Sequence, residues 1–340
     1  MAQGKITSLD VARRAGVSQS AVSRVFTPGA SASAATAAKV KKAAMELGYR
    51  PNPIARAMIT GKSRIIGLLV AYLDNQFYPV ALERLSQALQ ERGYHILVFM
   101  AQNSEDEISN TVQELLGYRV DGIIAASVSV DSALTAQCAE AGIPVVLFNR
   151  GQDGTELSSV TSANVAGGRK VAEFLVAGGH KRIAHIAGWS GSSTGRDRKM
   201  GFLNGLADLG QSPVAVIDGM YNREVAAEAA RQLMKSDTPP DAIFVGNDHM
   251  TFAVMDTLRD ELGLSVPGDV SVVGYDDVPA ASWSGYDLTT VRQPVNRMVE
   301  ATVETLLGEI DAADRPGQSI EIAGPLILRG SAKVPEGWTQ

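Results

Sequence analysis

Residues 8–25 read Ser-Leu-Asp-Val-Ala-Arg-Arg-Ala-Gly-Val-Ser-Gln-Ser-Ala-Val-Ser-Arg-Val, and this stretch has the pattern of two short helices joined by a tight turn. Gly16 can adopt the left-handed conformation that such a turn requires, and Ser18 is placed to cap the second helix. The first helix gains one apolar face from Leu9, Val11, Ala12 and Ala15. We therefore predict a helix-turn-helix near this end of the chain.

The second helix of this motif has two chemically different faces. Its apolar residues Ala21, Val22 and Val25 are expected to point back to the first helix. The residues that then face outward are Gln19, Ser20, Ser23 and Arg24. Amide and hydroxyl groups can form hydrogen bonds with base edges, and a guanidinium can contact bases or phosphates. This helix is thus predicted to lie in the major groove of double-stranded DNA.

The distribution of charge supports this interpretation. Residues 1–64 contain eleven basic and two acidic side chains, a net charge of +9, whereas the whole chain carries −6. The rest of the chain therefore carries −15. An asymmetry of this kind predicts that a polyanion binds to one end of the molecule only.

A third helix is expected over residues 33–47, with Ser33 as its N-cap and Gly48 at its end. It completes an all-α DNA-binding headpiece over residues 1–50. Two prolines, Pro51 and Pro53, then exclude the interior of a helix. We predict a hinge over residues 51–64 that is coil by itself and helical when DNA and a partner chain hold it.

The remainder of the chain, residues 65–340, alternates short apolar runs with amphipathic helical stretches. The apolar runs are residues 65–70, 95–99, 122–126, 145–148, 183–186, 242–245 and 270–273. Their alternation with helices predicts an α/β fold of parallel sheets that are covered on both faces. Because the segment is longer than one hydrophobic core usually supports, we expect two lobes.

Polar residues follow several of these apolar runs. They are Asp74, Asn75, Asn149, Arg150, Asn247, Asp248, Asp276 and Asp277. Ligands of open parallel sheets bind beyond the carboxyl ends of the strands. We therefore expect a small-molecule site in a cleft between the two lobes.

The motifs now allow a comparison with a known family. The chain contains Asp-Val-Ala-x-x-Ala-Gly-Val-Ser, Val-Ser-Arg-Val, Gly-Tyr-x-Pro-Asn, Asn247-Asp248 and Val-Gly-Tyr-Asp-Asp at residues 273–277. In these motifs it resembles the lactose repressor and galactose repressor family of bacterial transcription regulators. The resemblance implies a homodimer on a pseudopalindromic operator, with paired hinge helices that insert apolar side chains into the minor groove. By position, the DNA-binding residues would be Gln19, Ser20, Ser23, Arg24, Asn52, Ala55 and Met58.

The resemblance also implies a sensor like a periplasmic sugar-binding protein. Its N-lobe would comprise residues 65–162 and 293–322, and its C-lobe residues 163–292 and 323–340. The positions that match the family's effector site are Phe77, Phe148, Asn149, Arg198, Tyr221, Asn247 and Asp276. A carboxylate, amides and an arginine between aromatic faces suit a polyhydroxylated ligand, so we expect a sugar or sugar acid. The sequence leaves open whether this ligand is an inducer or a corepressor.

The polar residues of the cleft also have purely structural interpretations. Asn247 and Asp248 could cap the helix that follows them, and Arg198 could be a solvated charge among charged neighbours. For the whole protein, the alternative is a sugar-binding protein or enzyme of the same two-lobed fold without a DNA role. That alternative calls for an export signal or a catalytic set of residues, and the sequence shows neither.

Several further features limit the possible functions. The four histidines lack metal-ligand spacing, and the single Cys138 can form neither a zinc site nor an internal disulfide. We therefore expect a non-enzymatic protein without metal or cofactor. The lack of a signal-like or membrane-spanning apolar run predicts a cytoplasmic protein with no membrane partner. The leucine-repeat tail that makes the lactose repressor a tetramer is absent, which favours a dimer.

Overall fold

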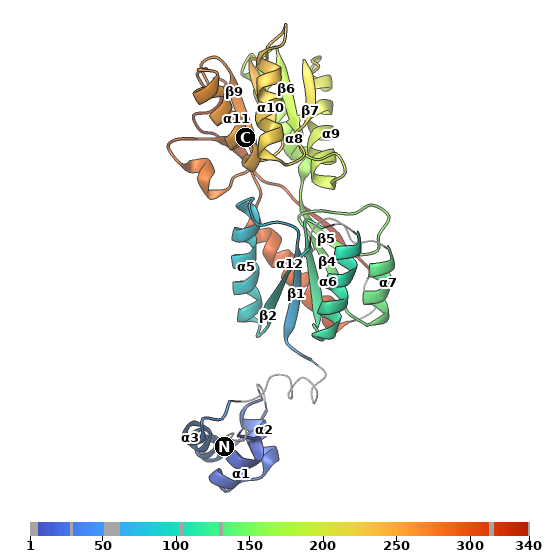
Figure 1. Cartoon of the computed structure of the whole chain (residues 1–340), viewed down its shortest axis with the longest axis vertical. Helices are drawn as coiled ribbons and strands as arrows, with labels where there is room; N and C mark the ends of the chain where they lie inside the picture. Colours follow the sequence, from blue (N-terminus) through green and yellow to red (C-terminus); the bar gives the residue numbers. More distant parts are fainter. Residues whose placement is uncertain are drawn as a thin grey trace. The chain divides into compact units, whose positions relative to one another are not determined.

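A computed structural model describes residues 6–27, 30–50, 62–101, 105–128, 132–312 and 316–338. The chain divides into two units, Met1–Ser63 and Arg64–Gln340, which are described separately below (Figure 1). Within the described ranges, no helix combines the length and hydrophobicity needed to cross a membrane.

The described part of the first unit contains three helices, α1 (Ser8–Ala15), α2 (Gln19–Val25) and α3 (Ala34–Leu47). Side chains cap their first turns, because the hydroxyls of Thr7, Ser18 and Ser33 accept hydrogen bonds from backbone N–H groups. Gly16 ends α1 at φ +67° and Gly48 ends α3 at φ +65°, both in the left-handed region. The small core consists of Val11, Ala12, Val22, Val40, Ala43 and Ala44.

One expectation for this core was wrong. Leu9 was placed on the apolar face of α1, but 43 % of its surface is exposed. Its neighbours Val11 and Ala12 are buried instead. An eight-residue helix presents only about two turns, and Val11 and Ala12 fill the contact with the other two helices.

The N-lobe is built on a six-stranded parallel sheet of order β11-β5-β4-β3-β1-β2. Its strands are β1 (Ile65–Val70), β2 (His95–Met100), β3 (Gly122–Ala126), β4 (Val145–Phe148), β5 (Ser158–Ser162) and β11 (Ser319–Ile322). Two pairs of helices cover opposite faces: α5 (Phe77–Glu91) with α12 (Val295–Asp311), and α6 (Glu105–Gly117) with α7 (Ser132–Glu140). Figure 1 shows this layered arrangement.

The C-lobe repeats this design with the order β12-β10-β9-β8-β6-β7. Its strands are β6 (Ile183–Ala187), β7 (Ala215–Asp218), β8 (Ala242–Val245), β9 (Ser271–Asp276), β10 (Thr289–Arg292) and β12 (Leu326–Ile327), and only β12 is antiparallel to its neighbour. One face carries α8 (Asn164–Ala177) and α9 (Ser193–Asp208), and the other α10 (Arg223–Met234) and α11 (Asp248–Asp256). Two short turns of helix, Thr257–Glu261 and Pro279–Ser282, complete this lobe.

The chain passes between the lobes three times. β5 ends at Ser162 and α8 starts at Asn164; β10 ends at Arg292 and α12 starts at Val295; β11 ends at Ile322 and β12 starts at Leu326. The carboxyl ends of the parallel strands therefore face the region between the lobes, as the α/β pattern predicted.

Helices α8 and α9 approach each other unusually closely, and two glycines make this possible. A Cβ on Gly201 would lie 1.9 Å from the carbonyl oxygen of Val165, and one on Gly168 would lie 2.2 Å from the carbonyl oxygen of Arg198. Any larger residue would push the helices apart. The close contact determines where α9 places the side chain of Arg198.

Candidate functional site

The exposed face of α2 is polar. Its central apolar residue Val22 is fully buried, whereas Gln19, Ser20, Ser23 and Arg24 are exposed. The amide of Gln19 donates a hydrogen bond to Ser8 Oγ over 3.0 Å, and Arg24 Nε donates to the carbonyl of Ser20 over 3.4 Å. These contacts are local and exposed to solvent, so the side chains can still bind another molecule. The other DNA-contact positions, Asn52, Ala55 and Met58, lie outside the described residues.

The centre of the cleft holds a buried ion pair. Arg198 Nη2 lies 3.3 Å from Asp276 Oδ1, and both side chains are at most 3 % exposed. Arg198 also donates to Asn164 Oδ1 over 2.9 Å and to the carbonyl of Gly246 over 2.7 Å, while its guanidinium lies 3.7 Å from the centre of the Tyr275 ring. The alternative interpretation of Arg198 as a solvated charge was wrong, because α9 directs it inward.

The carboxylate of Asp276 has several further partners. Gln293 Nε2 donates to Oδ1 over 2.7 Å, and Asn75 Nδ2, from the N-lobe, donates to Oδ2 over 3.3 Å. Burial raises the pKa of Asp276, and these donors together with Arg198 limit the rise. Burial alone would lower the pKa of Arg198, but Asp276 and the nearby tyrosines raise it, so the guanidinium stays charged.

A second buried carboxylate lies beside this pair. Asp248 Oδ1 accepts a hydrogen bond from Thr290 over 2.7 Å, and Oδ2 accepts one from the N–H of Val278 over 3.0 Å. Burial, reinforced by the negative charge of Asp276, holds the pKa of Asp248 well above its usual value. The sequence marked Asp248 only as a polar residue after a strand and a possible helix cap, because its burial depends on residues far along the chain.

Asn247 acts as a helix cap in the structure. Its Oδ1 accepts a hydrogen bond from the N–H of Met250 over 3.0 Å at the start of α11. This is the structural interpretation that the sequence left open. The residue is also 3 % exposed and adjoins Gly246, whose carbonyl binds Arg198. Its role as an effector ligand stays a prediction.

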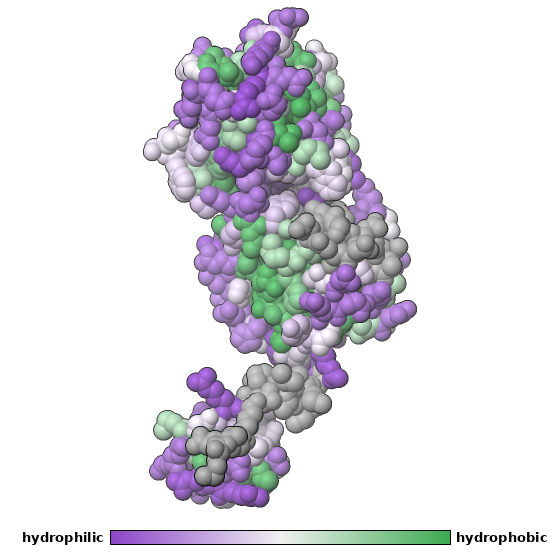
Figure 2. All heavy atoms as spheres, viewed as in Figure 1, coloured by the Kyte–Doolittle hydropathy of each residue, from purple (hydrophilic) through white to green (hydrophobic). Residues whose placement is uncertain are grey.

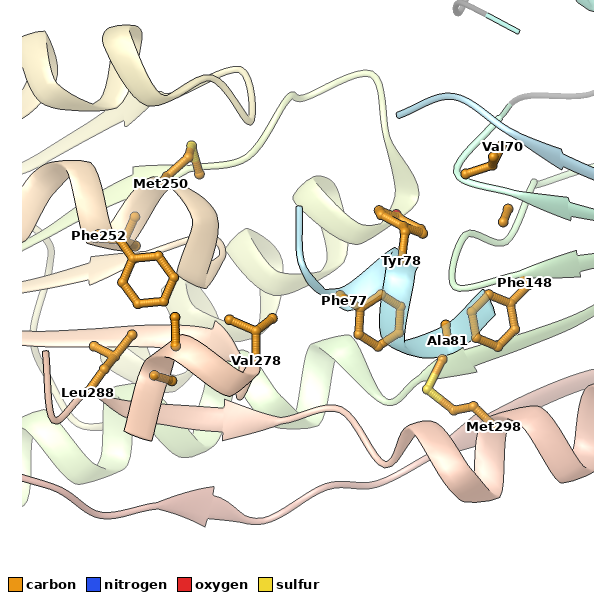
Figure 3. Close-up of a cluster of buried hydrophobic side chains, with 14 of the residues drawn as sticks. Val70, Phe77, Tyr78, Ala81, Phe148, Met250, Phe252, Val278, Leu288 and Met298 are labelled. Atoms are coloured by element: carbon orange, nitrogen blue, oxygen red, sulfur yellow. The ribbon is translucent and has the colours of Figure 1, made fainter. Parts of the chain in front are cut away.

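The expected aromatic residues occupy different surroundings. The rings of Phe77 and Phe148 stack with centroids 6.1 Å apart, and Figure 3 shows them beside Met298 of α12. Phe148 is fully buried within the N-lobe core, so it supports Phe77 from behind. Tyr221 is in the left-handed region at φ +55°, and its hydroxyl donates to Thr194 Oγ1 over 3.0 Å. Their contact with an effector stays a prediction.

Another polar group lies at the carboxyl ends of β1, β3 and β4 in the N-lobe. Asn149 Nδ2 donates to Tyr78 Oη over 2.9 Å. Arg150 donates to the carbonyl of Ser127 over 2.9 Å and to Tyr72 Oη over 3.4 Å. Arg150 was predicted only as one of the polar residues after strands that mark the cleft, and not as an effector ligand.

Contacts between the lobes occur on several sides of this cleft. The N–H of Gly151 donates to Ser193 Oγ over 3.1 Å, and the N–H of Ala280 donates to Gln76 Oε1 over 3.2 Å. An ion pair joins Arg196 to Asp153, and His249 Nε2 lies 3.5 Å from Asp74 Oδ2. Residues from both lobes therefore surround one polar interior.

Comparisons with known proteins agree with this arrangement. A family model described as bacterial regulatory proteins of the lacI family matches residues 7–52, and a periplasmic binding protein-like domain matches residues 172–332. The ribose operon repressor of Escherichia coli (strain K12) is 30 % identical over 96 % of this chain and 99 % of its own length. The chain belongs to the lacI family of bacterial regulatory proteins.

Two further relatives place this lacI-family chain among repressors. The HTH-type transcriptional repressor PurR of Photobacterium profundum is 29 % identical over 96 % of this chain and 98 % of its own length. A crystal structure of the lac repressor dimer, bound to operator and the anti-inducer ONPF, superposes with a TM-score of 0.86 at 29 % identity, over 96 % of this chain and 98 % of that one. The predicted family and the predicted fold class are confirmed.

One more solved structure bears on the cleft of this lacI-family protein. The transcriptional regulator CelR, solved as a complex with cellobiose, has a TM-score of 0.73 and 30 % identity, over 96 % of this chain and 99 % of that one.

Proposed function

We propose that this protein is a transcriptional repressor that binds a pseudopalindromic operator as a homodimer and is controlled by a small polyhydroxylated effector. One observation carries the proposal: a single chain combines an exposed, polar recognition helix with a two-lobed unit whose cleft encloses the Arg198–Asp276 pair. The relatives that are named as repressors match this chain over nearly their full length.

In this proposal residues 1–50 form the DNA-binding headpiece and residues 51–64 the hinge. Gln19, Ser20 and Arg24 would contact operator bases, because α2 exposes them opposite the buried Val22. Ser23 would share that surface, and Asn52, Ala55 and Met58 would contact DNA from the hinge. The net charge of +9 over residues 1–64 supplies the attraction to phosphates.

Residues 65–340 would bind the effector and form the dimer. Asp276 would accept from ligand hydroxyls, Asn149 and Asn247 would supply amide groups, and Arg198 would donate. Phe77 and Tyr221 would contact the apolar faces of the ligand, with Phe148 behind Phe77. The CelR complex with cellobiose supports an effector of this class.

The N-lobe offers a surface suited to a second copy of the chain. β2 is an edge strand, and it exposes 39 % of Val98 and 52 % of Met100. Figure 2 shows hydrophobic surface over the part of the N-lobe where Figure 1 labels β2. Exposed apolar edge strands of soluble proteins are usually covered by a partner.

A DNA selection tests the proposal directly. The full-length protein is mixed with random duplexes, bound DNA is sequenced, and binding to the recovered site is measured by fluorescence anisotropy with and without candidate polyols. We expect one palindromic site and one polyol that changes its affinity. Recovery of no preferred sequence, together with tight polyol binding, would instead favour a sugar-binding protein without a DNA role.

A further inference from the structure

Arg150 is a buried cation without a charged partner among the residues that the structure describes. It follows the end of β4 by two residues, and 5 % of its surface is exposed. Its hydrogen bonds reach only neutral groups, the carbonyl of Ser127 and the hydroxyl of Tyr72. Within the described ranges, its Nε has no hydrogen-bond partner at all.

The contrast with Arg198 shows what is missing. Arg198 has a carboxylate at 3.3 Å, so its charge is balanced inside the protein. A buried guanidinium that lacks such a partner is costly, because water no longer solvates it. Trp189, whose ring centre lies 5.8 Å from Arg150 in the opposite lobe, offers only a partial cation–π contact. The positive charge of Arg150 therefore has no counter-charge among the described residues.

Arg150 is one of the residues that line a cavity between the lobes. The cavity has a volume of about 120 Å³ and is lined by residues 150–153 of the N-lobe and by residues 191–193 and Arg196 of the C-lobe. Arg196 is already compensated, since it pairs with both Asp153 and Asp197. Of the two cations that line the cavity, Arg150 is the one whose charge is left for a ligand.

We propose that Arg150 binds a carboxylate of the effector, so that the effector is a sugar acid rather than a neutral sugar. This inference rests on the proposed function, because it names the ligand class of the same cleft. A planar guanidinium and a planar carboxylate form two parallel hydrogen bonds, and each carries one unit of charge. The unpaired Nε is the donor that such a fork requires.

The neighbours of Arg150 favour a carboxylate over a phosphate group. A phosphate monoester carries roughly −1.5 to −2 at neutral pH, more than one guanidinium can balance. The excess would lie close to Asp153, which lines the same cavity. Asn149 Oδ1, adjacent in sequence and also without a described hydrogen-bond partner, is an acceptor for a hydroxyl rather than for an anion. Arg150 and Asn149 together thus match a ligand in which one carboxylate is attached to a hydroxylated carbon chain.

Simple anions provide the first test, since no effector needs to be known. The melting temperature of the full-length protein is measured in sodium acetate and in sodium chloride at equal ionic strength. The variants are Arg150→Gln and, as a matched control, Arg182→Gln, which removes a half-exposed arginine that lies near Asp241 on the surface. Acetate should raise the melting temperature of the wild type and of Arg182→Gln above its value in chloride, but not that of Arg150→Gln. Equal melting temperatures in both salts for the wild type would overturn the proposal.

Matched ligands provide the second test. Calorimetry compares gluconate with glucitol and galactonate with galactitol, each pair differing in the carboxylate, and inorganic phosphate is the third arm. The wild type should bind one acid at least about 10-fold more tightly than its alditol, as expected for a charge-assisted hydrogen bond. Arg150→Gln should lose this preference, and Arg150→Lys, which keeps the charge without the fork, should retain part of it.

Three outcomes would contradict the proposal: an alditol that binds as tightly as its acid, a preference that survives in Arg150→Gln, or phosphate that stabilises the wild type more than acetate does. If Arg150→Gln fails to fold, the acid-to-alditol ratio of the wild type still decides. Operator binding by the wild type is measured in parallel. If it persists while the acid preference is missing, the carboxylate assignment fails and the repressor function stands.

Discussion

Asn75 Nδ2 of the N-lobe donates a hydrogen bond to Asp276 Oδ2 of the C-lobe over 3.3 Å, so one buried carboxylate links the two lobes. The other oxygen of Asp276 already binds Gln293 and Arg198. An effector hydroxyl that donates to Asp276 must therefore use a carboxylate oxygen that already has a partner, or it must displace Asn75 from Oδ2. Ligand binding and the contact between the lobes are therefore energetically coupled at this residue.

Replacing Asp276 by alanine should weaken effector binding by about 2 to 4 kcal/mol, because ligand hydroxyls lose a charged acceptor. It should also lower the free energy of unfolding by about 3 to 5 kcal/mol, since Arg198 is left as an unpaired buried charge. Calorimetry and urea denaturation measure the two effects. A repressor that is released by its inducer would then stay on the operator at effector levels that free the wild type.

Asp208→Asn is the matched control for this change. It breaks the exposed pair between Arg169 of α8 and Asp208 of α9, which should contribute at most about 1 kcal/mol. Wild-type effector affinity in Asp276→Ala would remove Asp276 from the binding site.

The double change Gln19→Met and Ser20→Ala should alter the preferred operator bases. Each lost base contact should cost roughly 1 to 3 kcal/mol at the position that it reads. Selection from random DNA measures the preference, and Gln232→Met on the exposed face of α10 serves as the control. An unchanged site preference would show that α2 does not read the bases.

Operator affinity should fall steeply with added salt. If several cations of each headpiece contact phosphates, the slope of log affinity against log salt should be on the order of −5 or steeper for the dimer. Anisotropy titrations over a range of salt concentrations measure it. A nearly flat dependence would contradict the role assigned to the basic residues of the first unit.

Acid should destabilise the protein through His185. Burial lowers the pKa of this histidine to about 4, and its ring stacks on Phe244 with centroids 4.6 Å apart. Because the unfolded chain binds the proton at about pH 6.5 and the folded chain does not, stability is fully present above that pH and is lost as the pH falls toward 4. The loss should reach about 3 kcal/mol.

Denaturation curves between about pH 7 and about pH 4 would measure this effect. This interval runs from the reference pKa of histidine down to the lowered pKa of His185. The variant His185→Phe should show a smaller decrease over this interval, whereas His95→Gln, at an exposed histidine, should follow the wild type. If all three proteins lose stability in parallel, His185 is not the group responsible.

The glycine contact between α8 and α9 predicts a strong effect of one methyl group. Gly201→Ala would meet the carbonyl of Val165 and should destabilise the protein by about 1 to 3 kcal/mol. It should also weaken effector binding, since Arg198 lies one turn earlier on α9. Gly117→Ala, where nothing lies within 4 Å, should be neutral or stabilising by up to about 1 kcal/mol. Equal melting temperatures for the two variants would contradict the close contact.

Hydrophobic pattern predicted the strongly apolar strands but not all of them. β5 has the sequence Ser-Ser-Val-Thr-Ser and is fully buried, because its hydroxyls bind partners such as Ser319 that lie far along the chain. β7 is a half-exposed edge strand of only four residues. Polar or short strands of this kind carry no clear periodicity, so only the folded chain reveals them.

The cleft shows a similar division. Asp276 was predicted because it follows a strand, and Arg198 because of the family resemblance. The structure brings these two residues together. The burial of Asp248 and the missing counter-charge of Arg150 follow from contacts between distant segments. No local pattern encodes them, because the same residues on a surface would be solvated.

The three crossings between the lobes affect the order in which the chain can fold during synthesis. The N-lobe sheet receives its outer strand β11 only after the strands β6 to β10 of the C-lobe have left the ribosome, and β12 follows last. A chain that stops short of β11 would leave β5 and β10 as open sheet edges, one in each lobe. Prematurely terminated products should therefore aggregate or be degraded, and neither lobe should survive as a fragment that competes for the effector.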